Sequence, residues 1–72
     1  MTAREMFFEI EDTEKYEEDR NFIKIYSKDC KEPYLIFEKC EKKLLIESLI
    51  TLGVEELNAI NQQVKELNWD NV

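Results

Sequence analysis

Carboxylates are the side chains of this chain with the clearest capacity for chemistry. The 72 residues include 17 Asp and Glu against 10 Lys and Arg, with no histidine, which gives a formal net charge of −7. Two adjacent pairs, Glu17–Glu18 and Glu55–Glu56, have the residue type needed to bind a hard cation or to act as acid and base. Their spacing fits no calcium-binding loop, so we interpret them as parts of a solvated acidic surface.

Other catalytic and ligand-binding arrangements find no support. The absence of histidine removes the usual imidazole base and metal ligand. A single glycine excludes a glycine-rich phosphate loop, and Ser27 and Ser48 have no base to activate them. Cys30 and Cys40 do not reproduce zinc-ligand spacing, and we interpret them as reduced thiols. We therefore expect no enzyme activity, no catalytic residue, no metal and no cofactor.

The charge is unevenly distributed along the chain. Residues 1–20 carry eight acids and three bases, and residues 44–72 carry five acids and one base. Residues 21–43 carry four acids and six bases, so this middle third is net positive. The basic middle third is expected either to pair with acids of a second subunit or to form a solvated rim.

Hydrophobic periodicity indicates the elements that must position these charges. Alternation over residues 4–11 predicts a strand. Residues 12–20, whose only apolar side chain is Tyr16, predict a solvated loop or a single frayed helical turn. Residues 22–27 and 34–40 predict two further strands. Short links between the three strands favour an antiparallel meander.

The period changes after Cys40. Apolar residues over 45–52 have helical spacing and favour a helix that ends at Gly53, with a fourth strand over 44–52 as the alternative. The apolar stripe of residues 54–67 predicts a second helix, and Trp69 is expected to fold back over the core. The predicted fold is therefore a single α+β domain over residues 1–72. Its three-stranded antiparallel sheet is followed by two C-terminal helices packed on one face.

This arrangement leaves more apolar surface than the helices can cover. Phe7, Phe22 and Tyr26 are expected on the sheet face opposite the helices, where a half-solvated sheet is normally polar. A chain this short buries only about 60% of its unfolded surface and often needs a partner subunit. We therefore expect a homodimer with Phe7, Phe22 and Tyr26 in its interface.

The acids have a geometry of their own in this fold. Glu5, Glu9 and Glu11 would project from one strand face, on which alternate residues are about 6.7 Å apart, roughly half the charge density of one DNA strand. Acids of the adjacent loop would extend the row into a surface comparable with a short duplex backbone. The residues expected to substitute for phosphates are Glu5, Glu9, Glu11, Asp12, Glu14, Glu17, Glu18 and Asp19, with Glu55, Glu56 and Asp70 as secondary candidates.

A tiny, strongly acidic, histidine-free chain of this kind resembles the phage-encoded acidic DNA-mimic inhibitor proteins. The resemblance lies in overall character and involves no shared motif, so no residue role is transferred by position. It implies a protein of the host-cell cytoplasm that binds the basic DNA-binding surface of a host protein, such as a histone-like nucleoid protein or a DNA-processing enzyme. Such a protein would inhibit that partner's DNA binding without binding nucleic acid itself.

The alternative is a small protein-interaction module, such as an antitoxin, an adaptor or a transcription regulator. Its binding site would be the aromatic sheet face, and its acids would supply solubility and faster encounter. Neither reading involves a membrane, because the apolar runs are too short to span one and the N-terminus has no signal-like pattern.

Overall fold

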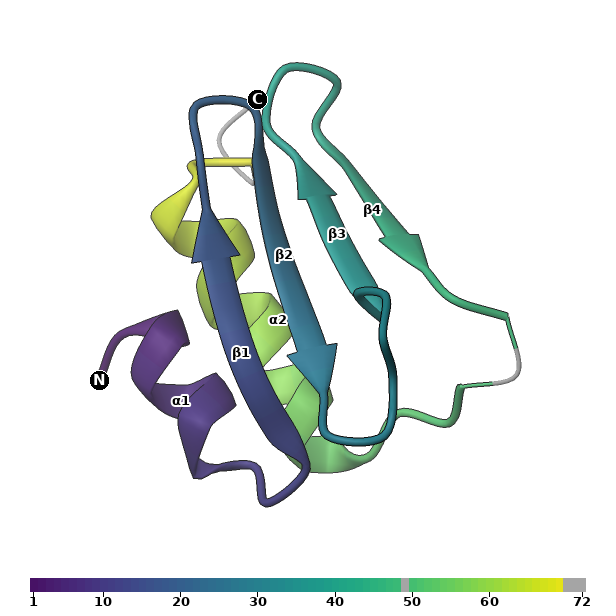
Figure 1. The fold of residues 1–72 in the computed structure, drawn as a ribbon. Coiled ribbons are helices and arrows are strands. Elements are labelled where there is room, and N and C mark those ends of the chain that lie inside the picture. The colour runs from purple at the N-terminus through teal and green to yellow at the C-terminus, as the bar shows by residue number, and fades with distance from the viewer. Residues whose placement is uncertain (49, 70–72) are drawn as a thin grey trace.

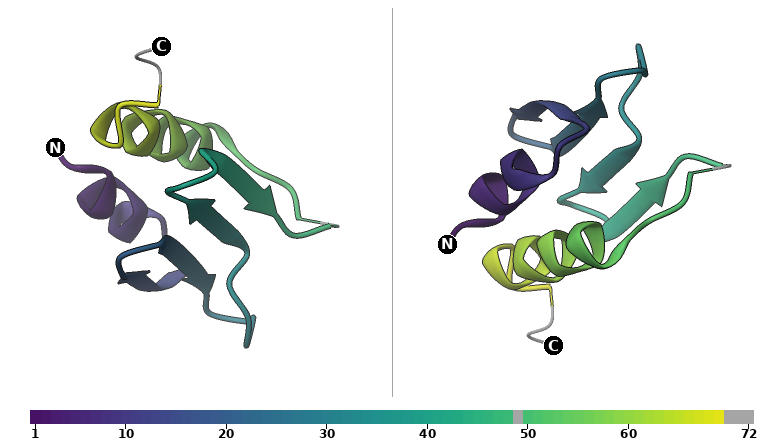
Figure 2. Two further views of the ribbon diagram at one scale, coloured as in Figure 1. Left: turned by 90° about the horizontal axis from the view of Figure 1, so that it is seen from above. Right: turned by 90° about the horizontal axis from the view of Figure 1, so that it is seen from below.

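The chain folds as an α+β structure with a four-stranded antiparallel sheet and two helices. The computed structural model describes residues 1–48 and 50–69. The strands lie in the sheet in chain order, and both helices cover the same face (Figures 1 and 2). The elements are α1 (Ala3–Glu9), β1 (Thr13–Glu18), β2 (Phe22–Ser27), β3 (Leu35–Glu38), β4 (Lys43–Ile46) and α2 (Val54–Glu66).

The core lies between the sheet and the two helices. Alternate residues of β2 and β3 face the helices, and Ile23, Ile25, Leu35 and Phe37 are almost completely buried. The Phe37 ring meets Trp69 at a centroid distance of 6.0 Å. Trp69 is half-buried against the core, which confirms the expected role of the only tryptophan.

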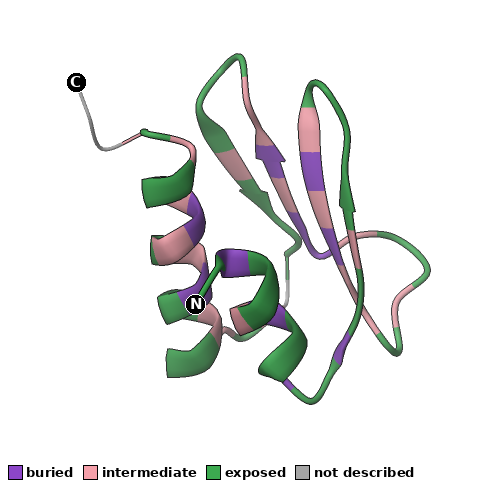
Figure 3. Cartoon of the chain, turned by 90° about the vertical axis from the view of Figure 1, so that its left-hand side faces the viewer, coloured by how far each residue is buried: buried purple, intermediate pink, exposed green. Residues whose placement is uncertain are grey.

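The N-terminal segment is a helix, so the prediction of a strand over residues 4–11 is wrong. Thr2 and Glu5 form a capping box in which each side chain satisfies the other residue's backbone N–H group at the start of the helix. Ala3, Phe7 and Ile10 recur at helical spacing and form the buried side of this segment (Figure 3). Phe7 is therefore fully buried in the core and does not lie on the outer sheet face expected for a dimer contact.

The predicted loop over residues 12–20 is mostly strand β1, which pairs with β2 in antiparallel register. Because β1 is an edge strand with one solvated face, a single inward apolar residue, Tyr16, is enough to anchor it. The Tyr16 hydroxyl donates a 2.7 Å hydrogen bond to Oε1 of Gln63 in α2. A β-bulge between Thr13 and Lys15 and the many charges protect this edge from pairing with another chain.

Residues 43–46 form β4, so the helix predicted over 45–52 is wrong. The alternative of a fourth strand is correct for residues 44–46, and residues 47–48 and 50–53 have no regular structure. A turn with Lys42 at φ 53° closes the β3–β4 hairpin and lets β4 satisfy the free edge of β3. Gly53 is the N-cap of α2 and not the end of a preceding helix.

The C-terminal helix predicted over residues 54–67 is confirmed as α2. Its most buried positions are Ala59 and Gln63, while Val54 at the start of the predicted apolar stripe is 72% exposed. Cys30 and Cys40 lie in the connections at either end of β3 and are both free.

The acidic end, a candidate functional site

The topology brings three connecting segments to one end of the molecule. The α1–β1 turn, the β2–β3 loop and the start of α2 lie together at the lower end of Figure 1. The backbone N–H of Lys28 donates to the Asp12 carbonyl at 2.8 Å, which ties the first two segments together. Glu47, just after β4, joins them because its N–H donates to the carbonyl of Tyr34. We call this region the acidic end. Its charged residues are Glu9, Glu11, Asp12, Lys28, Asp29, Lys31, Glu32, Glu47, Glu55 and Glu56.

Almost all of the net charge of the chain lies at the acidic end. Eight acids and two lysines give it a charge of −6, against −7 for the whole protein. The opposite end comprises residues 16–22, 38–43 and 62–69 and holds six acids and five bases. We call it the balanced end. Acidic and basic residues are interspersed along the sequence, but the antiparallel strands carry successive connections to opposite ends of the molecule. The excess of acids is therefore gathered at the acidic end.

Three of the acids predicted as phosphate substitutes have local structural roles. Glu5 accepts the N–H of Thr2, and hydrogen bonds from Thr2 hold the pKa of its carboxyl below the usual range. Asp19 accepts the N–H groups of residues 21 and 22 in the β1–β2 turn, which lowers the pKa of its carboxyl in the same way. Glu56 accepts the N–H of Gly53 at the start of α2. These carboxylates remain exposed or partly exposed, but their positions are set by backbone geometry.

Two further predicted acids are held by lysines. Glu18 lies 2.7 Å from the ammonium of Lys39, which also donates to the Asp19 carbonyl. Glu17 lies 3.3 Å from Lys15. The Tyr26 hydroxyl, followed by Lys15, lowers the pKa of the Glu17 carboxyl. Both acids lie toward the balanced end, where their charge is compensated.

The side-chain carboxylates of the remaining predicted acids have no hydrogen bond or ion pair to another residue within 1–48 and 50–69. Glu9, Glu11, Asp12 and Glu55 belong to this group and line two adjacent surface hollows that share Ile10 and Glu55. Glu14 also belongs to it, but it lies on β1 beside a different hollow. Asp70 lies outside the described residues. The structure thus replaces the expected row along one strand by a cluster at one end of the molecule.

Three acids of this end were not among the predicted site residues. Asp29 and Glu32 come from the β2–β3 loop, and Glu47 follows β4. The signal for the first two was present, because a loop after β2 must lie at the end where β1 begins. Placing Asp29 and Glu32 at this end from the sequence would have required residues 13–18 to be recognised as a strand.

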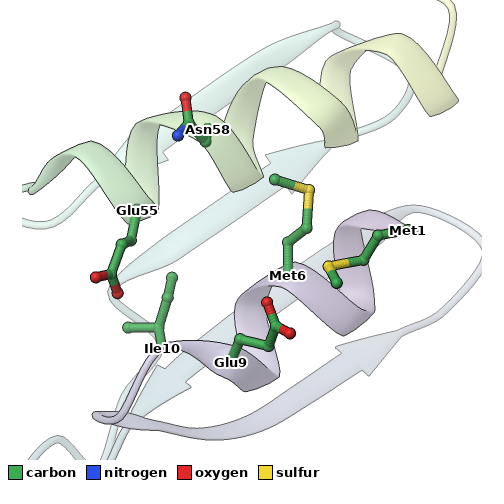
Figure 4. A pocket seen from close by; sticks show the side chains of 6 residues that line it. All are labelled: Met1, Met6, Glu9, Ile10, Glu55 and Asn58. Carbon is green, nitrogen blue, oxygen red and sulfur yellow. The ribbon is translucent and has the colours of Figure 1, made fainter.

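The larger hollow lies between α1 and α2 and has a volume of about 520 Å³. Met6, Ile10 and Met1 supply its apolar lining, and Glu9 and Glu55 come from the two facing helices (Figure 4). Asn58 completes the lining. We call it the α1–α2 hollow.

The face of the sheet opposite the helices remains uncovered in the single chain (Figure 2). Phe22 and Tyr26 are half-buried on it and Leu45 is 50% exposed. Lysines of the same face lie over the two aromatic rings, Lys15 over Tyr26 at 5.1 Å and Lys24 over Phe22 at 5.6 Å. This outer sheet face is therefore amphipathic and is not acidic overall.

Within the described residues no group of three or more Cys, Asp or Glu side chains is arranged to hold a metal ion. No helix of the described chain is both long and apolar enough to cross a bilayer. Comparisons with protein-family models, with curated proteins and with solved structures gave no significant match.

Proposed function

We propose that the protein is an acidic DNA mimic that binds the basic DNA-binding surface of a partner protein through its acidic end and inhibits DNA binding. The observation that supports this proposal is the gathering of a −6 charge at one end by four separate segments, Glu47 after β4 being the fourth. Four of these carboxylates have no partner within the described chain, so they are free to meet cations of another protein.

The magnitude of the charge fits a surface that normally contacts one side of a duplex. The shorter extents of the molecule are 23 and 21 Å. A duplex segment about 20 Å long carries roughly 12 phosphates, and a protein that binds one side of it contacts about half of them. The acidic end offers a comparable number of negative groups on a rigid frame.

Electrostatic binding of this kind has a characteristic dependence on salt. A cationic groove holds condensed or attracted anions, and the acidic end attracts cations, so association releases ions from both surfaces. We expect the affinity to fall steeply between 50 and 200 mM salt, by roughly 10³-fold for about six contacts of the kind made to DNA phosphates.

The test starts with affinity capture from a host-cell lysate in the presence and absence of duplex DNA. A captured DNA-binding protein that DNA displaces is then purified and loaded with a fluorescent duplex. The proposal predicts that the acidic protein releases the duplex at stoichiometric concentrations and that added salt weakens the effect. If the captured partner binds duplex and acidic protein at the same time, the proposal is wrong.

The outer sheet face supports a second candidate, a protein-interaction module that recognises its partner through Phe22 and Tyr26. The favouring observation is that both rings lie on a face that no helix of the chain covers. We propose a homodimer as the first occupant, because the face is close to charge balance and two copies can meet there without strong repulsion. Sedimentation equilibrium that finds only the 8.7 kDa species at micromolar concentration contradicts the dimer. A salt-tolerant partner complex that fails after Phe22→Ala favours the module over mimicry.

A further inference from the structure

We propose that the α1–α2 hollow receives a long cationic side chain, an arginine in particular, that projects from the partner's basic surface. This inference deepens the proposed function and rests on it, because it names the group that the acidic end recognises. It assigns the hollow to one residue of the partner, whereas the surrounding acids provide attraction without a fixed geometry.

The lining of the hollow combines two kinds of surface. Ile10 is only 7% exposed and Met6 is half-buried, so the floor is apolar and already shaped by the packing of α1 on α2. Glu9 of α1 and Glu55 of α2 both line the hollow, and Figure 4 shows Glu55 pointing from α2 toward Ile10. Neither carboxylate has a hydrogen bond or ion pair within residues 1–48 and 50–69.

An arginine side chain has the matching composition. Its aliphatic stem packs on apolar side chains, and methionine adapts readily to such a guest. Its guanidinium carries five N–H donors in a planar fork that suits carboxylate oxygens. With the stem on Met6 and Ile10, the head is placed near the carboxylates of Glu9 and Glu55.

Other occupants fit the same lining less well. A purely apolar side chain would remove two carboxylates from water without supplying a donor, which is costly. A phosphate or an acidic side chain would meet Glu9 and Glu55 within an end that already carries −6. The volume of about 520 Å³ lies within the range of small-molecule pockets and is large enough for a single side chain.

Agmatine, a four-carbon chain with a guanidinium at one end and an ammonium at the other, tests this inference on the full chain without a partner protein. We expect saturable shifts of the backbone amide signals of residues 6, 9, 10, 55 and 58 in ¹H–¹⁵N correlation spectra. Guanidinium chloride, which lacks the stem, and putrescine, which has the charge and the stem of agmatine but no guanidinium, are both expected to cause only weak shifts that do not saturate. Equal behaviour of agmatine and putrescine, or shifts spread evenly over all acidic residues, overturns the proposal.

Charge-matched variants separate the hollow from the general field. Glu9→Gln/Glu55→Gln should weaken agmatine binding at least tenfold, because both groups that meet the guanidinium lose their charge. Glu14→Gln/Glu32→Gln removes the same charge outside the hollow and should change the affinity less than threefold. An equal loss in both double variants overturns the proposal.

A steric pair gives an independent reading. Asn58 and Asn61 are both exposed on α2, and only Asn58 lines the hollow. Asn58→Trp should block agmatine binding, while Asn61→Trp should leave it unchanged, and the reverse result rejects the site.

If agmatine fails to bind while duplex DNA still displaces the protein from its partner, the proposed cation site in the hollow is wrong and the proposed DNA mimicry stands. If agmatine binds but DNA does not compete, mimicry is wrong and the cation site stands.

Discussion

The two ends of this small protein hold similar numbers of carboxylates but differ in how those carboxylates are used. At the balanced end, six acids face five bases, and polar side chains connect separate elements. Tyr16 reaches Gln63, Lys39 reaches Glu18, and Glu66 accepts the N–H of Ala3 at 2.7 Å. At the acidic end, eight acids face two lysines. Among the described residues of this end, the side-chain hydrogen bond is the local cap in which the Gly53 N–H donates to the Glu56 carboxylate.

This difference teaches that the number of acids on a chain does not define a binding surface. Carboxylates that hold a turn, a cap or an ion pair stabilise the fold and offer little free charge to a partner. Carboxylates without an internal partner repel one another and lower their energy when a cationic surface approaches. The binding function is therefore expected at the end where the charges are unpaired, and fold stability depends more on the other.

The largest expected effect separates the two ends by charge removal. The triple variant Glu11→Gln/Asp12→Asn/Asp29→Asn should weaken binding to the basic partner by at least about 100-fold, since each lost charge-assisted contact costs roughly 1–3 kcal/mol. The matched triple Glu17→Gln/Glu38→Gln/Glu41→Gln, at the balanced end, should weaken it less than fivefold. Fluorescence anisotropy at one fixed salt concentration measures both. Equal losses would mean that net charge alone governs binding.

The next effect concerns the polar connection at the balanced end. Gln63 is 2% exposed, and its Oε1 accepts the Tyr16 hydroxyl. Tyr16→Phe leaves this buried oxygen without its donor and should lower the free energy of unfolding by about 1–3 kcal/mol. Tyr26→Phe on the outer sheet face is the control and should cost less than about 1 kcal/mol. Urea denaturation followed by tryptophan fluorescence measures both changes, and equal values would contradict the assigned role of Gln63.

The same tyrosine gives a test by pH. Burial, together with the charges of Glu18 and Glu66, raises the pKa of Tyr16 to about 12 from the ordinary 10. The unfolded chain therefore releases this proton first, and the stability that depends on the neutral hydroxyl is complete below pH 10. It is lost as the pH rises from about 10 to 12. The difference in unfolding free energy between wild type and Tyr16→Phe should shrink over this interval, and a constant difference would contradict the shifted pKa.

The sequence was informative where burial alternates and misleading where one face is solvated. Strands β2 and β3 were predicted because both place large apolar residues inward, and α2 because its stripe is long. β1 was missed because an exposed edge strand needs only Tyr16 on its inner side. The alternation of Met6, Phe8 and Ile10 favours a strand where the structure has α1, although Thr2 and Glu5 form the capping signature of a helix.

Those local errors determined what could be predicted of the site. With residues 4–11 as a strand, Glu5, Glu9 and Glu11 form a row, whereas on α1 and its turn they separate by role. Glu5 caps the helix, and Glu9 and Glu11 line different hollows of the acidic end. The residue types of the site were thus available from the sequence. The gathering of these residues at one end was not available from the sequence, because it depends on which end of the molecule each strand and helix runs toward.

The smallest expected effect is that removing one carboxylate changes the free energy of unfolding in opposite directions at the two ends. Glu18→Gln at the balanced end removes an exposed ion pair and should lower the free energy of unfolding by about 0.2–1 kcal/mol. Glu11→Gln at the acidic end removes repulsion without breaking a contact and should raise it by a few tenths of a kcal/mol at low salt. Thermal unfolding at 10 and 300 mM salt measures both. Screening should shrink both differences, and a destabilising Glu11→Gln would show that its carboxylate has a structural role after all.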